Sequence, residues 1–346
     1  MPPVTPANTI STLSASPVLV EIRRGAVIEC WHRGVVAVVD VDGRIVAQTG
    51  DVERAIFARS AIKPLQALPL VETGAADASG AEPADLALAC ASHGGEPQHV
   101  ERILAWLTRL GLSAQDLECG VHPPYHAPSA AALIRAGQAP TTLHHDCAGK
   151  HTGVLATCRH LGEPTRGYIE PTHPAQRRIL RALEEMCGLD LADAPRGRDG
   201  CGFPQIAIKV RALAHAVARL GCPDALPPLR AASCRRLAAA MMAHPVMVSW
   251  SNNFVAQVSA IAHAKVLLKS GADGVFVAAI PAKGLGIALK IEDGAGIARE
   301  VAMAALIARH AGLDEEERAA MAALIERPLN NDAGKIVGAI APAPNW

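Results

Sequence analysis

The sequence is poor in aromatic residues and has no excess of charge of either sign. Phe, Trp and Tyr make up 3% of the 346 residues, and 33 Lys and Arg balance 33 Asp and Glu. Without a basic run or a positive net charge, the chain lacks the electrostatic signature of a nucleic-acid-binding protein. No apolar segment approaches the roughly 18 residues of a membrane span, because His, Lys or Gly interrupts each candidate. We therefore expect neither nucleic acid nor a membrane as a partner.

Common binding motifs are also missing. No phosphate-binding loop is present, although glycines recur at positions 284, 286, 294 and 296, and this excludes nucleotide binding as a main function. No Cys-x-x-Cys pair with the spacing of a structural zinc site is present. Residues 1–16 lack a charged segment followed by an apolar run, so we predict a flexible polar lead-in rather than a signal peptide.

The hydrophobic residues, half of the chain, follow strand patterns at both ends and helical patterns between them. Alternation predicts a strand at 18–23, a hairpin at 34–47 with Asp42-Gly43 at its turn, and strands at 274–280, 286–292 and 335–340. Helical periodicity predicts helices at 97–110, 129–137, 150–161, 174–187, 206–219, 230–243, 253–269, 294–311 and 315–325.

These patterns predict an α/β (α+β) fold with two lobes. Both chain ends build one antiparallel sheet flanked by helices, and a helical lobe is inserted between them. After the lead-in, residues 17–346 form a single catalytic unit, with a sheet lobe at about 17–58 and 264–346 and a helical lobe at about 59–263. We expect the site in the groove between the sheet and the helical lobe.

One stretch, Ala58-Arg59-Ser60-Ala61-Ile62-Lys63-Pro64, places a hydroxyl and an amine three residues apart, where an irregular segment becomes a helix. Residues at i and i+3 share a helix face, so Lys63 can reach back over Ser60. A lysine can take the proton of a serine only if burial or a second cation lowers its pKa. The alternative is an N-cap serine followed by a surface lysine.

Two further stretches carry serine or lysine at the end of an element. Ser92, within Cys90-Ala-Ser-His-Gly-Gly-Glu96, follows an apolar helical pattern, and its alternative role is to satisfy helix-terminal backbone groups. Lys269-Ser270-Gly271 is similar to the K-[ST]-G element that lies opposite the nucleophile in S-x-x-K acyl-transfer enzymes. The S-D-N element expected between them is absent, and Ser251-Asn252-Asn253 is only a weak substitute.

Two of the nine cysteines differ from the others. Most lie in apolar or helical patterns, as buried thiols do in a reducing compartment, and we expect a cytoplasmic protein. Cys147 and Cys201 instead lie beside glycine in polar turns. With a nearby His or Lys, two such thiols could hold Zn²⁺ with one position open. The alternatives are a redox pair or two free thiols.

The chain resembles the asparaginase II family, the Rhizobium-type L-asparaginases, from about residue 20 to 340. The resemblance rests on stretches in the same order, namely A-R-S-A-I-K-P at 58–64, C-A-S-H at 90–93, C-A-G-K-H at 147–151, D-G-C-G-F-P at 199–204, K-S-G-A-D at 269–273 and G-I-A-L-K-I-E-D-G at 286–294. It implies a fold similar to serine β-lactamases and glutaminases, hydrolysis of L-asparagine to L-aspartate and ammonia, and a homodimer.

The resemblance also implies roles for individual residues. The catalytic serine–lysine units fall on Ser60 with Lys63 and on Ser92 with Lys269. A zinc ion falls on Cys147, Lys150 and Cys201, with water completing the tetrahedron, and organises substrate binding without being indispensable for the chemistry. Four further positions match substrate-binding residues of the family, namely Arg59, His93, Asp199 and His151.

One segment departs from the family pattern. Where the family continues through V-A-G-x-x-R after Met242-Ala243-His244-Pro245, this chain has Val246-Met-Val-Ser-Trp-Ser-Asn-Asn253. If that arginine holds the α-carboxylate of the substrate or shapes the pocket, the departure affects the preference for asparagine. The serine–lysine chemistry does not depend on it.

The resulting prediction is an amidohydrolase acting on a small amide such as L-asparagine. Lys63, kept neutral by burial and by Lys269, deprotonates Ser60, Ser92 relays protons, and backbone N–H groups stabilise the oxyanion. Two alternatives are a related serine amidase or glutaminase acting on another small amide, and a non-enzymatic zinc or thiol-redox protein.

Overall fold

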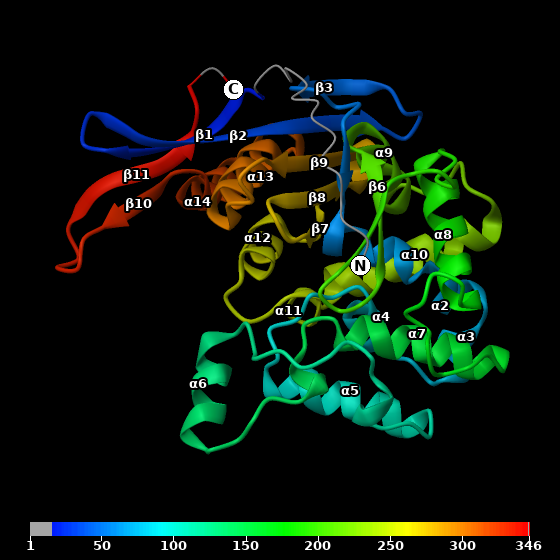
Figure 1. The fold of residues 1–346 in the computed structure, drawn as a ribbon. Helices are drawn as coiled ribbons and strands as arrows, with labels where there is room; N and C mark the ends of the chain where they lie inside the picture. The colour runs from blue at the N-terminus through cyan, green and yellow to red at the C-terminus, as the bar shows by residue number, and fades with distance from the viewer. Residues whose placement is uncertain (1–15, 345) are drawn as a thin grey trace, which may run out of the picture.

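A computed structural model describes residues 16–344 and 346, so the predicted lead-in lies outside the described residues apart from Ser16. The main sheet has the strand order β10-β11-β1-β2-β9-β8-β7, with β3 paired to β2 (Figure 1). Every pairing is antiparallel. The strands come from both chain ends: β1 (Val18–Arg24), β2 (Val27–Asp40), β3 (Ile45–Thr49), β7 (Leu267–Ser270), β8 (Val275–Ile280), β9 (Leu285–Ile291), β10 (Arg327–Asn330) and β11 (Ile336–Pro342). The predicted fold class is confirmed.

Helices cover the central strands on both faces. As a result, all six residues of β8 are buried. Helix α9 (Val210–Gly221) packs on β2, β8 and β9, while α13 (Gly296–His310) packs on β1, β8, β9 and β11. Gly286 of β9 allows the close approach of α9, since a Cβ there would lie 2.0 Å from the carbonyl oxygen of Ala214. Helix α14 (Glu315–Ile325) packs on α13.

The segment between the two sets of strands forms the helical lobe, below the sheet in Figure 1. Its helices are α1 (Lys63–Gln66), α2 (Leu68–Glu72), α3 (Ala75–Ala78), α4 (Pro83–Ala89), α5 (Pro97–Arg109), α6 (Ala127–Arg135), α7 (Ala148–Leu161), α8 (Pro174–Cys187), α10 (Pro228–Ala243), α11 (Pro245–Val248) and α12 (Phe254–Ala262). A small sheet of β4 (Ala55–Phe57), β6 (Pro204–Lys209) and β5 (Arg196–Arg198) joins this lobe. None of the helices in the described residues is both long and apolar enough to span a bilayer.

Two helix predictions were wrong at one end, in each case because a strand pairing replaces the helix. The helix expected from 206 begins only at Val210, since Pro204–Lys209 pairs with β4 and β5. The helix expected to run through 269 ends at Ala262, where His263 and Ala264 adopt left-handed backbone angles. Lys269 therefore lies on a strand, paired with Val277 of β8.

Candidate active site

Ser60 follows a residue with a strained backbone. Arg59 has φ of +53°, a left-handed conformation that costs energy in any residue with a Cβ. Side-chain contacts hold it there, because Arg59 donates from Nε and Nη2 to Asp199 at 3.0 and 2.8 Å and also pairs with Asp273. Its backbone N–H donates to Gln205 at 3.2 Å. The conformation of the Ser60 turn is thus determined by residues far away in the sequence.

A pocket of about 330 Å³ opens beside this turn. One side comes from the sheet lobe and the start of α13, and the other from the helical lobe, so the pocket lies where the sequence predicted a site. Its lining residues are Ser60, Ser92, Tyr125, Asp146, Trp250, Ser270, Gly271, Ala272, Gly294, Gly296 and Arg299.

Two buried lysines meet at the hydroxyl of Ser92. Lys63 Nζ and Lys269 Nζ each lie 2.9 Å from Ser92 Oγ. Lys63 also donates to the carbonyl of Ala91 at 2.7 Å, and Lys269 to that of Ser270 at 2.7 Å. The structure therefore brings Ser92 and Lys269 together as predicted. Within residues 16–344, no hydrogen bond joins the hydroxyl of Ser60 to either lysine.

The environment separates the pKa values of the two lysines. Burial, reinforced by the nearby charge of Lys63, lowers the pKa of Lys269 well below its ordinary value. Burial also opposes the charge on Lys63, but Cys147 and Asp146 outweigh this effect and raise the pKa of Lys63. These shifts favour the neutral form of Lys269, whereas the expectation from the sequence assigned the neutral form to Lys63.

Asp146, which sequence reasoning did not single out, provides the negative charge in this group. Its carboxylate lies 3.4 Å from Lys63 Nζ and 3.1 Å from Nδ1 of His145. Burial opposes its ionisation, but Lys63 and His145 hold the pKa of Asp146 well below its usual range. Burial likewise opposes the charge on His145, yet contacts with Asp146 and Cys147 raise the pKa of His145 to about 9.

Backbone N–H groups distinguish the two serines. The N–H of Ser92 is used by the carbonyl of Val248 at 3.0 Å, whereas the N–H groups of Ser60 and Ala272 have no acceptor in the part of the chain that the structure describes. The end of β7 and the Ser60 turn approach each other closely, since a Cβ on Gly271 would lie 2.8 Å from the carbonyl oxygen of Ala58. Two free donors thus border the pocket, as an oxyanion site requires.

The structure brings the three predicted zinc ligands close together. Cys147 directly precedes α7, Lys150 lies in its first turn, and Lys150 Nζ is 3.1 Å from Cys201 Sγ. The hydrogen bond between the thiols lowers the pKa of Cys147 well below its ordinary value and raises that of Cys201. Two sulfur donors and one amine nitrogen within reach of each other fit a tetrahedral zinc ion with one open position.

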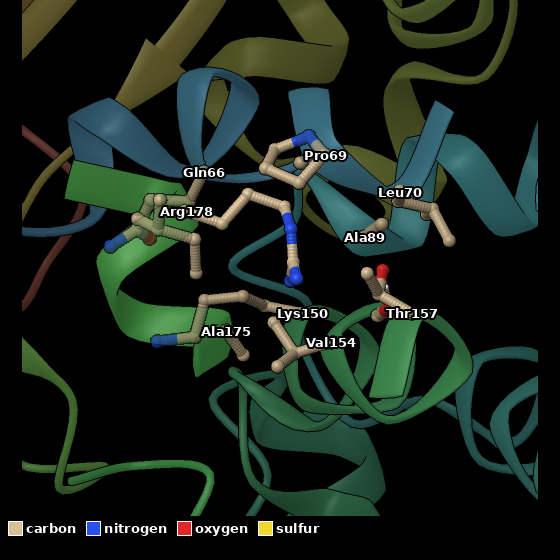
Figure 2. A pocket seen from close by; sticks show the side chains of 12 residues that line it. Gln66, Pro69, Leu70, Ala89, Lys150, Val154, Thr157, Ala175 and Arg178 are labelled. Atoms are coloured by element: carbon tan, nitrogen blue, oxygen red, sulfur yellow. Dashed lines mark hydrogen bonds between the residues drawn. The ribbon is translucent and has the colours of Figure 1, made fainter. Parts of the chain in front are cut away.

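Lys150 also lines a second cavity (Figure 2). It has a volume of about 10 Å³ and is lined mainly by apolar groups of α1, α2, α7 and α8. Space for about one water molecule is too little for a substrate. This cavity is therefore a packing defect beside the thiol pair and no alternative active site.

None of the four predicted substrate-binding residues lines the pocket. Arg59 and Asp199 bind each other. His93 and His151 are fully buried, and the Nε2 atom of each has no partner within the described residues. Their roles in binding stay predictions. The pocket residues that sequence reasoning missed are Tyr125, Asp146, Trp250 and Arg299.

The sequence offered a recognisable signal for only some of these four missed residues. Asp146 adjoins the predicted ligand Cys147, and Trp250 lies in the segment that departs from the family pattern. Rings of Trp250 and Tyr125 stack at 6.2 Å between centroids, with 14° between their planes. Arg299 had no signal, because a single arginine near the start of a helix is common on protein surfaces.

Several solved structures are similar to this chain. A beta-lactamase from Mycobacterium bovis is 16% identical, with a TM-score of 0.39, 80% of this chain and 94% of that chain covered. The D-alanine carboxypeptidase AmpC from Burkholderia cenocepacia is 13% identical, with a TM-score of 0.37 and coverages of 84% and 91%. A protein named Mglu is 15% identical, with a TM-score of 0.40; the match covers 75% of this chain but only 56% of the length of Mglu.

A search of curated proteins found no match. The family model described as L-asparaginase II matches residues 20–342, which include the serines, both buried lysines and the thiol pair. This match extends over nearly the whole described chain. The chain therefore belongs to the L-asparaginase II family.

Proposed function

We propose that this protein is an amidohydrolase that converts L-asparagine to L-aspartate and ammonia through an acyl-enzyme. The observation that carries the proposal is the pocket itself, which is lined by Ser60 and Ser92 and in which two buried lysines with opposite pKa shifts contact the hydroxyl of Ser92. Such a pair, one lysine charged and one neutral, is the arrangement that lets a lysine act as a base at neutral pH.

In this proposal Ser60 is the nucleophile. Its oxygen bonds to the side-chain carbonyl carbon of asparagine, and the N–H groups of Ser60 and Ala272 stabilise the oxyanion. The hydroxyl proton passes through Ser92 to Lys269, and the same route returns a proton to the leaving nitrogen. The carbon–nitrogen bond breaks, ammonia departs, and water hydrolyses the ester. Lys63 stays protonated and stabilises the negative charge that develops on the serine oxygens.

The test of this proposal is ammonia release by the purified protein from L-asparagine and, separately, from L-glutamine. We expect asparagine to be hydrolysed with the larger kcat/KM, since the family to which the chain belongs is the L-asparaginase II family. A preference for glutamine would make the protein a glutaminase on the same machinery. Absence of ammonia from both amides would contradict the proposed function.

We also propose that Cys147, Lys150 and Cys201 hold a zinc ion. When bound, zinc would supply positive charge and an open coordination position at the base of the pocket. The thiol pair would bind it as thiolates, and Lys150 would have to donate a lone pair, so binding releases protons.

Zinc content gives a prediction that is independent of activity. The protein purified after growth with zinc should contain about one zinc per chain, and both Cys147→Ser and Cys201→Ser should reduce the content by more than about tenfold, because each variant removes a ligand. Elemental analysis by plasma mass spectrometry measures this. Cys234→Ser, which changes another buried thiol, in α10, is the matched control. Equal zinc content in all four proteins would exclude this site.

A further inference from the structure

Only two of the residues that line the pocket are charged, Asp146 and Arg299. The charge of Asp146 is compensated, because Lys63 and His145 contact its carboxylate at 3.4 and 3.1 Å. The electrostatic character of the pocket therefore depends on Arg299.

The charge of Arg299 has no counterion in the described residues. Its Nη1 donates to the carbonyl of Gly271, while its Nε is buried without a hydrogen-bond partner. The adjacent carboxylate, Glu300, is bound by Arg327 at 2.9 Å. Arg59, which directly precedes Ser60, does have counterions, because Asp199 and Asp273 both bind it.

A partly buried cation without a counterion is unfavourable, since a single hydrogen bond to a backbone carbonyl returns only part of the hydration energy that burial costs. The helix dipole adds to this cost. Arg299 lies near the N-terminus of the fifteen-residue helix α13, where the helix dipole is positive and the first turn carries no acidic residue. Gly294 and Gly296, at this same helix end, line the pocket. This side of the pocket is thus prepared for an anion.

We propose that Arg299 binds a carboxylate of the substrate and so selects amides that carry a free carboxylate. The proposal rests on the amidohydrolase function above and identifies the α-carboxylate of asparagine as the group received. An arginine and a carboxylate form a charge-assisted, often bidentate, pair. The bound carboxylate supplies the missing counterion, while the rest of the substrate occupies the pocket that Ser60 and Ser92 also line.

The experiment compares two substrates that differ only in this carboxylate: L-asparagine, and β-alaninamide, which is asparagine without it. Ammonia release is measured for the wild type, Arg299→Gln, Arg299→Lys and, as a matched control on the same helix, Arg309→Gln. Loss of a charged hydrogen-bonded pair is expected to lower kcat/KM of Arg299→Gln for asparagine by about 100-fold, mainly through KM. Its kcat/KM for β-alaninamide should change by less than about threefold. Arg299→Lys should recover part of the loss, and Arg309→Gln should match the wild type.

Two results would overturn the proposal while leaving the amidohydrolase function intact: Arg299→Gln hydrolyses asparagine as well as the wild type, or it loses the same factor on both substrates. The second result would show that Arg299 supports the structure of the pocket. A wild type that releases no ammonia from asparagine would instead refute the proposed function. The substrate comparison also guards against loss of folded protein, because misfolding lowers both rates equally.

Discussion

Ser60→Ala is expected to lose about 10⁴-fold or more in kcat on L-asparagine, because it removes the atom that would form the acyl-enzyme bond. Ser92→Ala should lose about 10²- to 10³-fold, the typical contribution of a proton-transfer group. The difference follows from the backbone: the N–H of Ser92 is taken by Val248, whereas the N–H of Ser60 is free to stabilise an oxyanion. Rates are measured as ammonia release at saturating asparagine.

Intact-protein and peptide mass spectrometry of rapidly quenched reactions identifies the acylated serine. We expect an aspartyl adduct on the peptide that contains Ser60 in the wild type, and none in Ser60→Ala. Ser233→Ala, at a buried serine of α10 far from the pocket lining, is the control for loss of a buried hydroxyl. An adduct on Ser92, or an active Ser60→Ala, would reverse the two roles; the contacts of Ser92 Oγ with both lysines would then be those of a nucleophile with its base.

Lys269→Met is expected to abolish measurable hydrolysis while making the folded protein more stable at neutral pH. The lysine is fully buried, and burial lowers its pKa. Between that lowered pKa and the unfolded value of about 10.4, the unfolded chain binds more protons than the native one. Stability attributable to Lys269 is therefore complete above about pH 10.4 and is lost as the pH falls through this window. A methionine at this position has no proton to bind, so the variant does not lose this stability as the pH falls.

The same shift predicts the pH dependence of the wild type. Activity should fall as the pH falls through the lowered pKa of Lys269, because the protonated amine cannot accept a proton. The measurements are a pH profile of kcat and urea unfolding of both proteins across the same pH range. Stability of the variant equal to or below that of the wild type at every pH would contradict the assignment of Lys269 as the neutral lysine.

Lys63→Met provides the opposite case and serves as the matched control. Cys147 and Asp146 raise the pKa of Lys63 despite its burial. The stability due to Lys63 is therefore fully present below the unfolded value of about 10.4 and is lost only as the pH rises through the raised pKa. Removing this cation leaves Asp146 without its partner, so Lys63→Met should destabilise the protein at neutral pH.

The fold class could be predicted from the sequence because the signals are local. Alternating residues marked strands at both ends of the chain, and helical periodicity marked the lobe between them; α8, expected at 174–187, begins and ends at these residues in the structure. Predictions failed where pairing with another strand decided the outcome. Leu267–Ser270 is apolar enough for either element, and pairing with β8 makes it a strand.

The sequence by itself determined the chemical groups of the site: two serines, two lysines, two thiols beside glycines, and the order of the motifs that carry them. Only the tertiary structure decided how these groups act. Lys63 and Lys269 are 206 positions apart, yet both contact the hydroxyl of Ser92. Which lysine is neutral depends on Asp146 and Cys147, which reach Lys63 from another part of the chain. Charge and burial act through space, so a pKa or an unpaired arginine follows from the packing of distant segments and leaves no local pattern in the sequence.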